Sequence, residues 1–227
     1  MAKKNQSEEQ LNAVDELNEN LTQVTEKVQN NQKIIVWCSL AVAAIVAVVL
    51  IYIYLVHEPG VAKANDEIGK ADIQLALGND SVALSQYMNV TDKFGHDAGN
   101  RAALQSACLL YKDGKYEEAL RYIDKFSPSE NVIGAAAESL KGDCYVNLDN
   151  LDKAVSAYKS AISRSDDSPL YTPFFMLKLA RVYRAQENYS AEAEVYQDIL
   201  DNYPQYGATY GVDVEKYLNR ARNQAGK

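Results

Sequence analysis

The chain has 227 residues, with 23 lysines and arginines against 31 aspartates and glutamates, and a net charge of −8 at pH 7. An acidic chain without a basic stripe lacks the side chains that neutralise phosphates, which excludes nucleic acid as its main partner. Apolar residues make up 47% of the chain, too large a share for a disordered protein.

Residues 1–33 form a polar head with an apolar stripe at coiled-coil spacing. The stripe follows alternating steps of three and four, the a/d spacing of a coiled-coil seam: Val14, Leu17, Leu21, Val24 and Val28. This spacing is compatible with a helix that pairs with itself or docks on a membrane partner. An amphipathic helix lying at the membrane interface is the alternative.

Residues 34–56 contain no charged side chain. At about 1.5 Å per helical residue the segment reaches roughly 34 Å, and a bilayer's hydrocarbon core is about 30 Å thick. Trp37 lies near one end and Tyr52 and Tyr54 near the other, where amphipathic rings meet the membrane surface. The segment is therefore predicted to be a single transmembrane helix that acts as an uncleaved signal-anchor.

Cleavage and orientation are less well determined by the sequence. An Ala-x-Ala pattern at 62–64 makes a cleaved signal peptide the alternative. Lys27 and Lys33 on one side of the segment balance Lys63 and Lys70 on the other, so the positive-inside rule does not decide. A short head normally stays in the cytoplasm, so we expect residues 57–227 to be exported; a cytoplasmic position for them is the alternative.

Residues 57–227 contain an internal repeat. Segments 113–123, 149–159 and 187–197 align at offsets of 36 and 38 residues, and 78–88 is a weaker copy. Periods this close to about 34 mark the tetratricopeptide repeat, a pair of antiparallel helices. The fold is therefore predicted to be all-α: one transmembrane helix followed by a tetratricopeptide-repeat solenoid of three clear helix pairs, one divergent pair and a C-terminal capping helix.

Residue sizes along the repeat support this interpretation. Small and large residues alternate where two helices must approach and where rings must fill the space beside them: Gly142, Tyr145, Ala154, Tyr158 and Ala161. Breakers at 127–129 and 165–169 separate successive pairs, Thr172–Pro173 is placed as a helix cap and first turn, and 212–223 is the capping helix. Glu192 takes the place of an alanine, so we expect a local shift of that helix.

The sequence contains no sign of catalysis. The sequence around His57 and His96 contains no cluster of cysteines, histidines or carboxylates at metal-ligand spacing, and there is no glycine-rich phosphate loop or nucleophile elbow. We therefore expect no enzymatic activity, no catalytic residue, no metal and no cofactor. Cys108 and Cys144 form either a disulfide or, as we expect, two reduced and buried thiols, and Cys38 lies in the apolar segment.

A solenoid of this kind offers the surface of its first helices to partners. Projection of the repeat gives Leu104, Cys108, Tyr111, Lys112, Ser139, Asp143, Val146, Asn147, Leu177, Arg181 and Arg184. The candidate binding residues among them are Leu104, Tyr111, Lys112, Asp143, Asn147, Leu177, Arg181 and Arg184. Arg181 and Arg184 suit an acidic partner segment; solvated helix surface is the alternative for both.

One apolar segment followed by three to four degenerate repeats resembles the YfgM-like family of ancillary Sec-translocon subunits, over roughly residues 34–206. The resemblance implies a single-pass protein of the bacterial inner membrane with a periplasmic solenoid. It implies the SecYEG translocon, periplasmic chaperones or exported polypeptides as partners. The heptad stripe exceeds what the resemblance explains, and it motivates an alternative: a scaffold of an envelope complex that self-assembles into a homo-oligomer.

Overall fold

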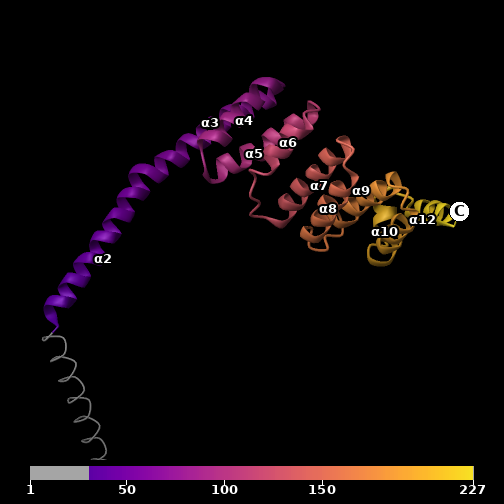
Figure 1. Cartoon of the computed structure of the whole chain (residues 1–227). Helices are drawn as coiled ribbons and strands as arrows, with labels where there is room; N and C mark the ends of the chain where they lie inside the picture. Colours follow the sequence, from indigo (N-terminus) through magenta and orange to yellow (C-terminus); the bar gives the residue numbers. More distant parts are fainter. Residues whose placement is uncertain (1–30, 227) are drawn as a thin grey trace, which may run out of the picture. The chain divides into compact units, whose positions relative to one another are not determined.

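The computed structural model describes residues 31–226, which are helical throughout apart from turns and short linkers. The chain divides into two compact units, one up to Gly60 and one from Val61 onward. The predicted heptad stripe lies outside the described residues. Within them, the expected all-α architecture with an apolar helix and a solenoid of helix pairs is confirmed (Figure 1).

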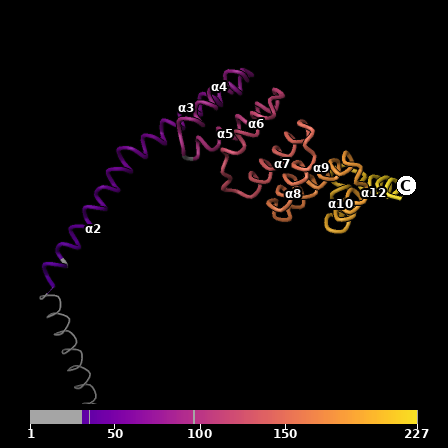
Figure 2. Tube along the Cα trace, viewed as in Figure 1, coloured from indigo at the N-terminus to yellow at the C-terminus, as the bar shows by residue number. Residues whose placement is uncertain are grey.

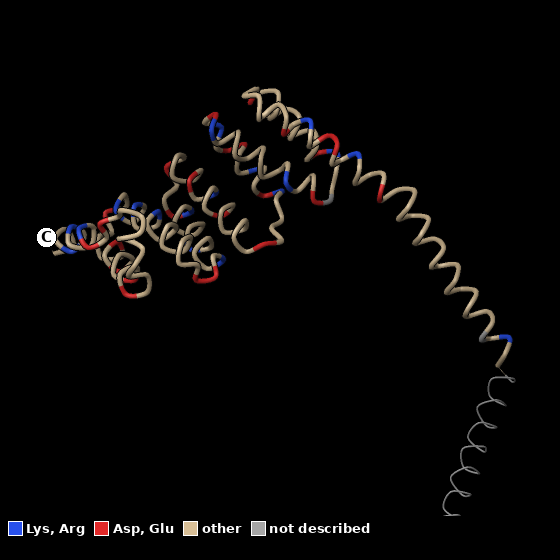
Figure 3. The backbone as a smooth tube through the Cα atoms, turned by 180° about the vertical axis from the view of Figure 1, so that it is seen from behind, with Lys and Arg blue, Asp and Glu red and all other residues tan. Residues whose placement is uncertain are grey.

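Helix α2 (Gln32–Tyr52) is the predicted apolar helix. Its side chains are largely exposed in the part of the chain that the structure describes: Trp37, Ile45 and Val48 are all more than 60% exposed. The backbone in Figure 3 carries no charged residue along α2 beyond its first turn. By length and composition this helix is able to cross a membrane, and no part of its most apolar stretch is buried within the described residues.

A single π-helical turn, η1 (Ile53–His57), follows α2 and precedes α3 (Glu58–Ala76). In this turn the Glu58 N–H donates to the Ile53 carbonyl, one residue further back than in an α-helix. Pro59 has no N–H, and in an α-helix its ring would clash with the carbonyl four residues earlier. The wider turn accommodates the proline without ending the helix.

The second unit is a succession of antiparallel helix pairs, as the Cα trace shows (Figure 2). Pair 1 consists of α3 and α4 (Asp80–Lys93), and pair 2 consists of α5 (His96–Lys112) and α6 (Tyr116–Ile123). Pair 3 is α7 (Asn131–Asn147) with α8 (Leu151–Arg164), and pair 4 is α9 (Tyr171–Ala185) with α10 (Tyr189–Asn202). Helix α12 (Val214–Ala225) packs on α10 as the cap.

Each pair turns between its two helices in the same way. One residue at each turn has a left-handed backbone: Gly78, Gly114, Asp149 and Glu187, with φ of 77°, 76°, 56° and 57°. The next N–H bonds back to a carbonyl five residues earlier, as in Asn79 to Gln74, Lys115 to Leu110, Asn150 to Tyr145 and Asn188 to Tyr183. The divergent first pair therefore shares the backbone repeat of the other three.

The core follows the expected pattern of small and large residues. Ala83, Ala119 and Ala154 are fully buried at equivalent positions of α4, α6 and α8. In pair 3 the two helices meet so closely that a β-carbon on Gly142 would lie 2.7 Å from the ring of Tyr158. Only glycine allows this approach, because real β-carbons do not come so near another heavy atom.

The start of α9 and the C-terminal end differ from prediction. Helix α9 begins at Tyr171, so Thr172 lies inside the first turn instead of capping it. Its hydroxyl lies 2.6 Å from the Ser165 hydroxyl, and both residues are buried. A short helix, α11 (Tyr206–Tyr210), was not predicted, and the capping helix begins at Val214, two residues later than expected.

Glu192 also corrects a prediction. The helix does not shift to bury Ala191 or Ala193; the glutamate itself fills the small-residue position and is 1% exposed. Its Oε1 accepts a hydrogen bond from Arg220 of α12 at 2.8 Å. The cap therefore supplies the charge that makes a buried carboxylate tolerable at this position.

Candidate functional site

The candidate binding residues lie on the first helices of pairs 2, 3 and 4, here called the first-helix face. The face is defined by the eleven projected positions: Leu104, Cys108, Tyr111 and Lys112 on α5, Ser139, Asp143, Val146 and Asn147 on α7, and Leu177, Arg181 and Arg184 on α9. Asn147 donates to the Tyr111 hydroxyl at 3.3 Å, so the structure brings α5 and α7 together at this face.

Asp143 lies at the centre of a polar network that joins three helices. Its carboxylate accepts a hydrogen bond from the Tyr158 hydroxyl of α8 at 2.5 Å and one from Lys178 Nζ of α9 at 2.6 Å. Lys178 also donates to the Ser139 hydroxyl at 3.1 Å. Burial, followed by the Asp143 hydrogen bond, raises the pKa of Tyr158, so its hydroxyl stays protonated as a donor. Asp143 is thus already satisfied within the chain.

The same arrangement recurs in pair 1. Asp72 of α3 accepts from the Tyr87 hydroxyl of α4 at 2.6 Å and from Arg101 of α5 at 2.6 Å. The aspartate and the tyrosine each stand 71 positions before their counterparts Asp143 and Tyr158. In pairs 1 and 3 an aspartate therefore binds the tyrosine of its own pair and a cation of the next pair, which links pair 1 to pair 2 and pair 3 to pair 4.

Other candidate residues have different surroundings. Lys112 forms an ion pair with Asp80 of α4 at 2.5 Å, and this contact raises the pKa of Lys112. Leu104 and Leu177 are half-buried, and Leu177 packs against the core around α10 and α12. Arg181 and Arg184 are exposed and make no hydrogen bond or ion pair with another described residue. They are thus the charged groups of the first-helix face that remain available to a partner.

A small cavity of about 210 Å³ opens on this face between α7, α8 and α9. Its walls are mostly apolar and include Val146, Leu151 and Val182, and the Asp143–Lys178 ion pair closes one side. Arg181 also lines it. The structure therefore places three of the eleven projected positions, Asp143, Val146 and Arg181, at one cavity, while Arg184 is not part of its lining.

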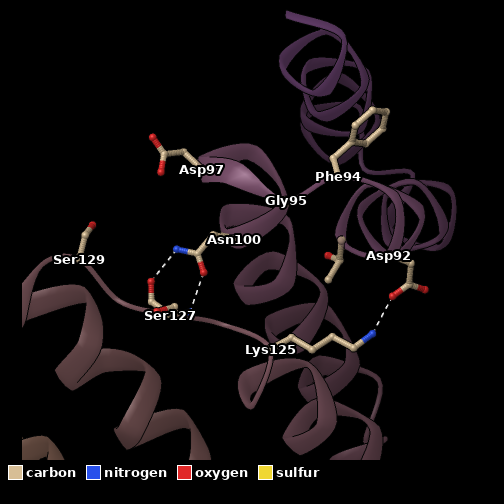
Figure 4. A pocket seen from close by; sticks show the side chains of 10 residues that line it. Asp92, Phe94, Gly95, Asp97, Asn100, Lys125, Ser127 and Ser129 are labelled. Carbon is tan, nitrogen blue, oxygen red and sulfur yellow. Dashed lines mark hydrogen bonds and ion pairs between the residues drawn. The ribbon is translucent and has the colours of Figure 1, made fainter. Parts of the chain in front are cut away.

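A second hollow, of about 710 Å³, lies between the α4–α5 corner and the linker from α6 to α7 (Figure 4). Its polar groups are largely engaged with one another: Lys125 pairs with Asp92 at 2.6 Å. The Asn100 amide donates to the Ser127 carbonyl at 2.7 Å and accepts from the Ser127 N–H at 2.6 Å. These contacts tie pair 2 to the linker, and we assign them a structural role.

Sequence reasoning missed the residues that hold the face together. Lys178 and Tyr158 were not recognised as partners of Asp143, and Arg220 was not recognised as the partner of Glu192. The sequence signal for the Asp143–Tyr158 contact is the 71-residue recurrence of the aspartate and the tyrosine.

The cysteines are free thiols, with Cys144 buried and Cys108 exposed, so the expectation of a buried Cys108 was wrong. Burial, with smaller contributions from Asp143 and Cys108, raises the pKa of Cys144 to about 12. No cluster of three or more histidine, cysteine, aspartate or glutamate side chains suited to a metal ion occurs within residues 31–226.

Comparison with solved structures gives the same fold. A crystal structure of MamA protein matches with a TM-score of 0.53 and 17% identity, over 72% of this chain and 92% of that one. MamA from Desulfovibrio magneticus RS-1 matches with a TM-score of 0.51 and 17% identity, over 61% and 75%. A chain of the APC/C hetero-tetramer Cut9–Hcn1 matches with a TM-score of 0.53 and 16% identity, over 70% of this chain and 29% of that one. Identities this low show the fold alone.

Sequence comparison identifies the family. No curated protein matches the chain. The family described as tetratricopeptide repeat-like domain matches residues 64–184, which is more than half of the chain. The family described as tetratricopeptide repeat matches residues 175–206, which correspond to pair 4. The four helix pairs, their common turns and these matches agree: the chain belongs to the tetratricopeptide repeat-like domain family.

Proposed function

We propose that this protein is a membrane-anchored protein-interaction module without enzymatic activity. Tetratricopeptide-repeat domains mediate protein–protein interactions, which gives the second unit its general role. The observation that carries the membrane part is α2, an apolar helix of 21 residues whose described side chains are all exposed. Exposure of these apolar side chains to water is unfavourable, and insertion of the helix into a bilayer removes them from water.

The proposed setting is the bacterial inner membrane, with the head in the cytoplasm and the second unit in the periplasm. Two things support it: the uncharged segment at 34–56, and the resemblance of the chain to YfgM-like ancillary subunits of the Sec translocon. In this setting the partners are subunits of the SecYEG translocon, periplasmic chaperones or exported polypeptides emerging from the channel.

Site-specific photo-crosslinking in intact membranes tests this function. A photoreactive phenylalanine replaces Cys108, which is exposed on the first-helix face of α5. The control replaces Ser160, exposed on the second helix α8. We expect adducts with translocon subunits, chaperones or exported chains from position 108 and few from position 160. Equal adducts from both positions would argue against a dedicated face, and adducts with none of these proteins would remove the translocon from the proposal.

A further inference from the structure

The cavity between α7, α8 and α9 has the features of a binding site for an apolar side chain. Tyr158 and Val182 are buried at the cavity, while Val146 is 39% exposed at its edge. Its volume of about 210 Å³ is on the scale of a single large apolar side chain. An apolar side chain that enters it is removed from water, which is worth about 1.5–3 kcal/mol for a leucine or phenylalanine.

The residues that line the cavity carry a net positive charge. Lys178 and Asp143 neutralise each other at 2.6 Å, which leaves the Arg181 guanidinium as the unpaired charge in the cavity lining. Arg184 stands three residues later on α9 and is also exposed and unpaired among the described residues. Residues three apart on a helix are neighbours on its surface, about 5–6 Å apart at their β-carbons. Two guanidinium groups therefore lie on α9 close to an apolar hollow.

From this charge complementarity we propose that the cavity binds an internal acidic segment of a partner polypeptide, in which a leucine-sized apolar side chain is flanked by carboxylates. The apolar side chain enters between Val146 and Arg181, and the flanking carboxylates pair with Arg181 and Arg184. Arginine suits this role because its planar fork binds a carboxylate through two parallel hydrogen bonds. The inference rests on the proposed function, since it names the class of partner for the same face.

Other cations near the first-helix face are already engaged. Arg101 is paired with Asp72, Lys112 with Asp80 and Lys178 with Asp143. An acidic ligand that displaced any of these would have to replace an ion pair that already exists. At Arg181 and Arg184 the acidic ligand forms a new ion pair without breaking an existing one, so we expect it to bind at pair 4.

Fluorescence anisotropy of labelled peptides against the full chain in detergent tests the proposal. The probe is GSEELEESG, amidated at its C terminus so that it has no terminal carboxylate. Two further peptides replace either its glutamates with lysine or its leucine with serine. We expect binding of the first peptide to exceed binding of both others by at least about tenfold, because charge-assisted hydrogen bonds and leucine burial are each worth more than this factor.

Two variants and a matched control locate the site. Arg181→Glu and Val146→Asp are expected to weaken binding of the probe by about tenfold or more. Lys216→Glu makes the same reversal of charge as Arg181→Glu on α12, at an exposed residue, and is expected to change binding by less than about twofold. All three side chains are exposed, so unchanged circular dichroism should accompany each variant.

The proposal is overturned if the leucine-free peptide binds as tightly as the probe, or if Arg181→Glu and Lys216→Glu weaken binding equally. The same probe with a free C-terminal carboxylate is measured alongside, and tight binding by that peptide alone would also overturn the proposal, in favour of terminal carboxylate recognition. Photo-crosslinking from position 108 separates this result from the fate of the proposed function, because that position lies outside the cavity lining. Partner adducts there with no peptide binding would leave the module intact and remove only this inference.

Discussion

Replacement of Tyr158 by alanine is expected to destabilise the second unit by about 3–5 kcal/mol, the range for truncating a buried aromatic side chain. Tyr158 is 2% exposed, and its ring fills the space beside Gly142. Its hydroxyl also holds Asp143, which joins α8 to α7 and through Lys178 to α9. The loss therefore combines a cavity between two helices with a weakened link to the next pair. Urea unfolding followed by circular dichroism measures it.

Tyr158→Phe is the matched control. It keeps the ring and removes only the hydroxyl, while Asp143 retains the ammonium group of Lys178. The expected cost is about 1.5–3 kcal/mol, the value of one hydrogen bond to a charged group. If the alanine and phenylalanine variants unfold at the same urea concentration, the ring does not carry the packing that the structure assigns to it.

Replacement of Arg220 by methionine is expected to cost about 3 kcal/mol, at the low end of the range for breaking a buried ion pair, because the Arg220 side chain is itself 34% exposed. Its guanidinium lies 2.8 Å from the Glu192 carboxylate, which is 1% exposed. The methionine leaves that carboxylate buried without a counter-charge. For a domain of this size the thermal midpoint should fall by roughly 6–12 °C.

A second variant, Glu192→Ala, tests whether the lost stability comes from the buried carboxylate. Alanine is the residue that the other three pairs place at this position. Glu192→Ala in the Arg220→Met background is therefore expected to restore most of the lost stability, because it removes the buried charge. A double variant that is less stable than Arg220→Met alone would show that the carboxylate contributes through other contacts, contrary to this account.

The helix pairs were predictable because the physical cause lies within each repeat. Ala83, Ala119 and Ala154 recur at regular offsets since two helices must approach at the same place in every pair. The turns recur for the same reason. Asp149 and Glu187 take the left-handed backbone position that glycine occupies in the first two pairs, so glycine alone does not mark these turns in the sequence. Local spacing is enough to find such features.

The polar contacts between one pair and the next were not predictable in this way, because they form between helices that are distant in sequence. Asp143 and Lys178 are 35 residues apart, and their pairing depends on how tightly α7 and α9 stack. The spacing of the repeat placed Asp143 on the first-helix face. It did not show that the Asp143 carboxylate already accepts hydrogen bonds from Tyr158 and Lys178. Glu192 was misread for the same reason, since its partner lies in the capping helix.

Alkaline carbonate extraction of membranes tests the central proposal, that α2 anchors the helical domain to a bilayer. Carbonate strips proteins held only at the surface and leaves those with a transmembrane helix in the membrane pellet. A matched variant carries Val42→Lys and Val49→Lys, each expected to cost about 2.5–3.5 kcal/mol within a membrane. We predict that the unaltered full chain stays in the pellet and that the double variant is released. Recovery of the unaltered chain in the supernatant would contradict the account.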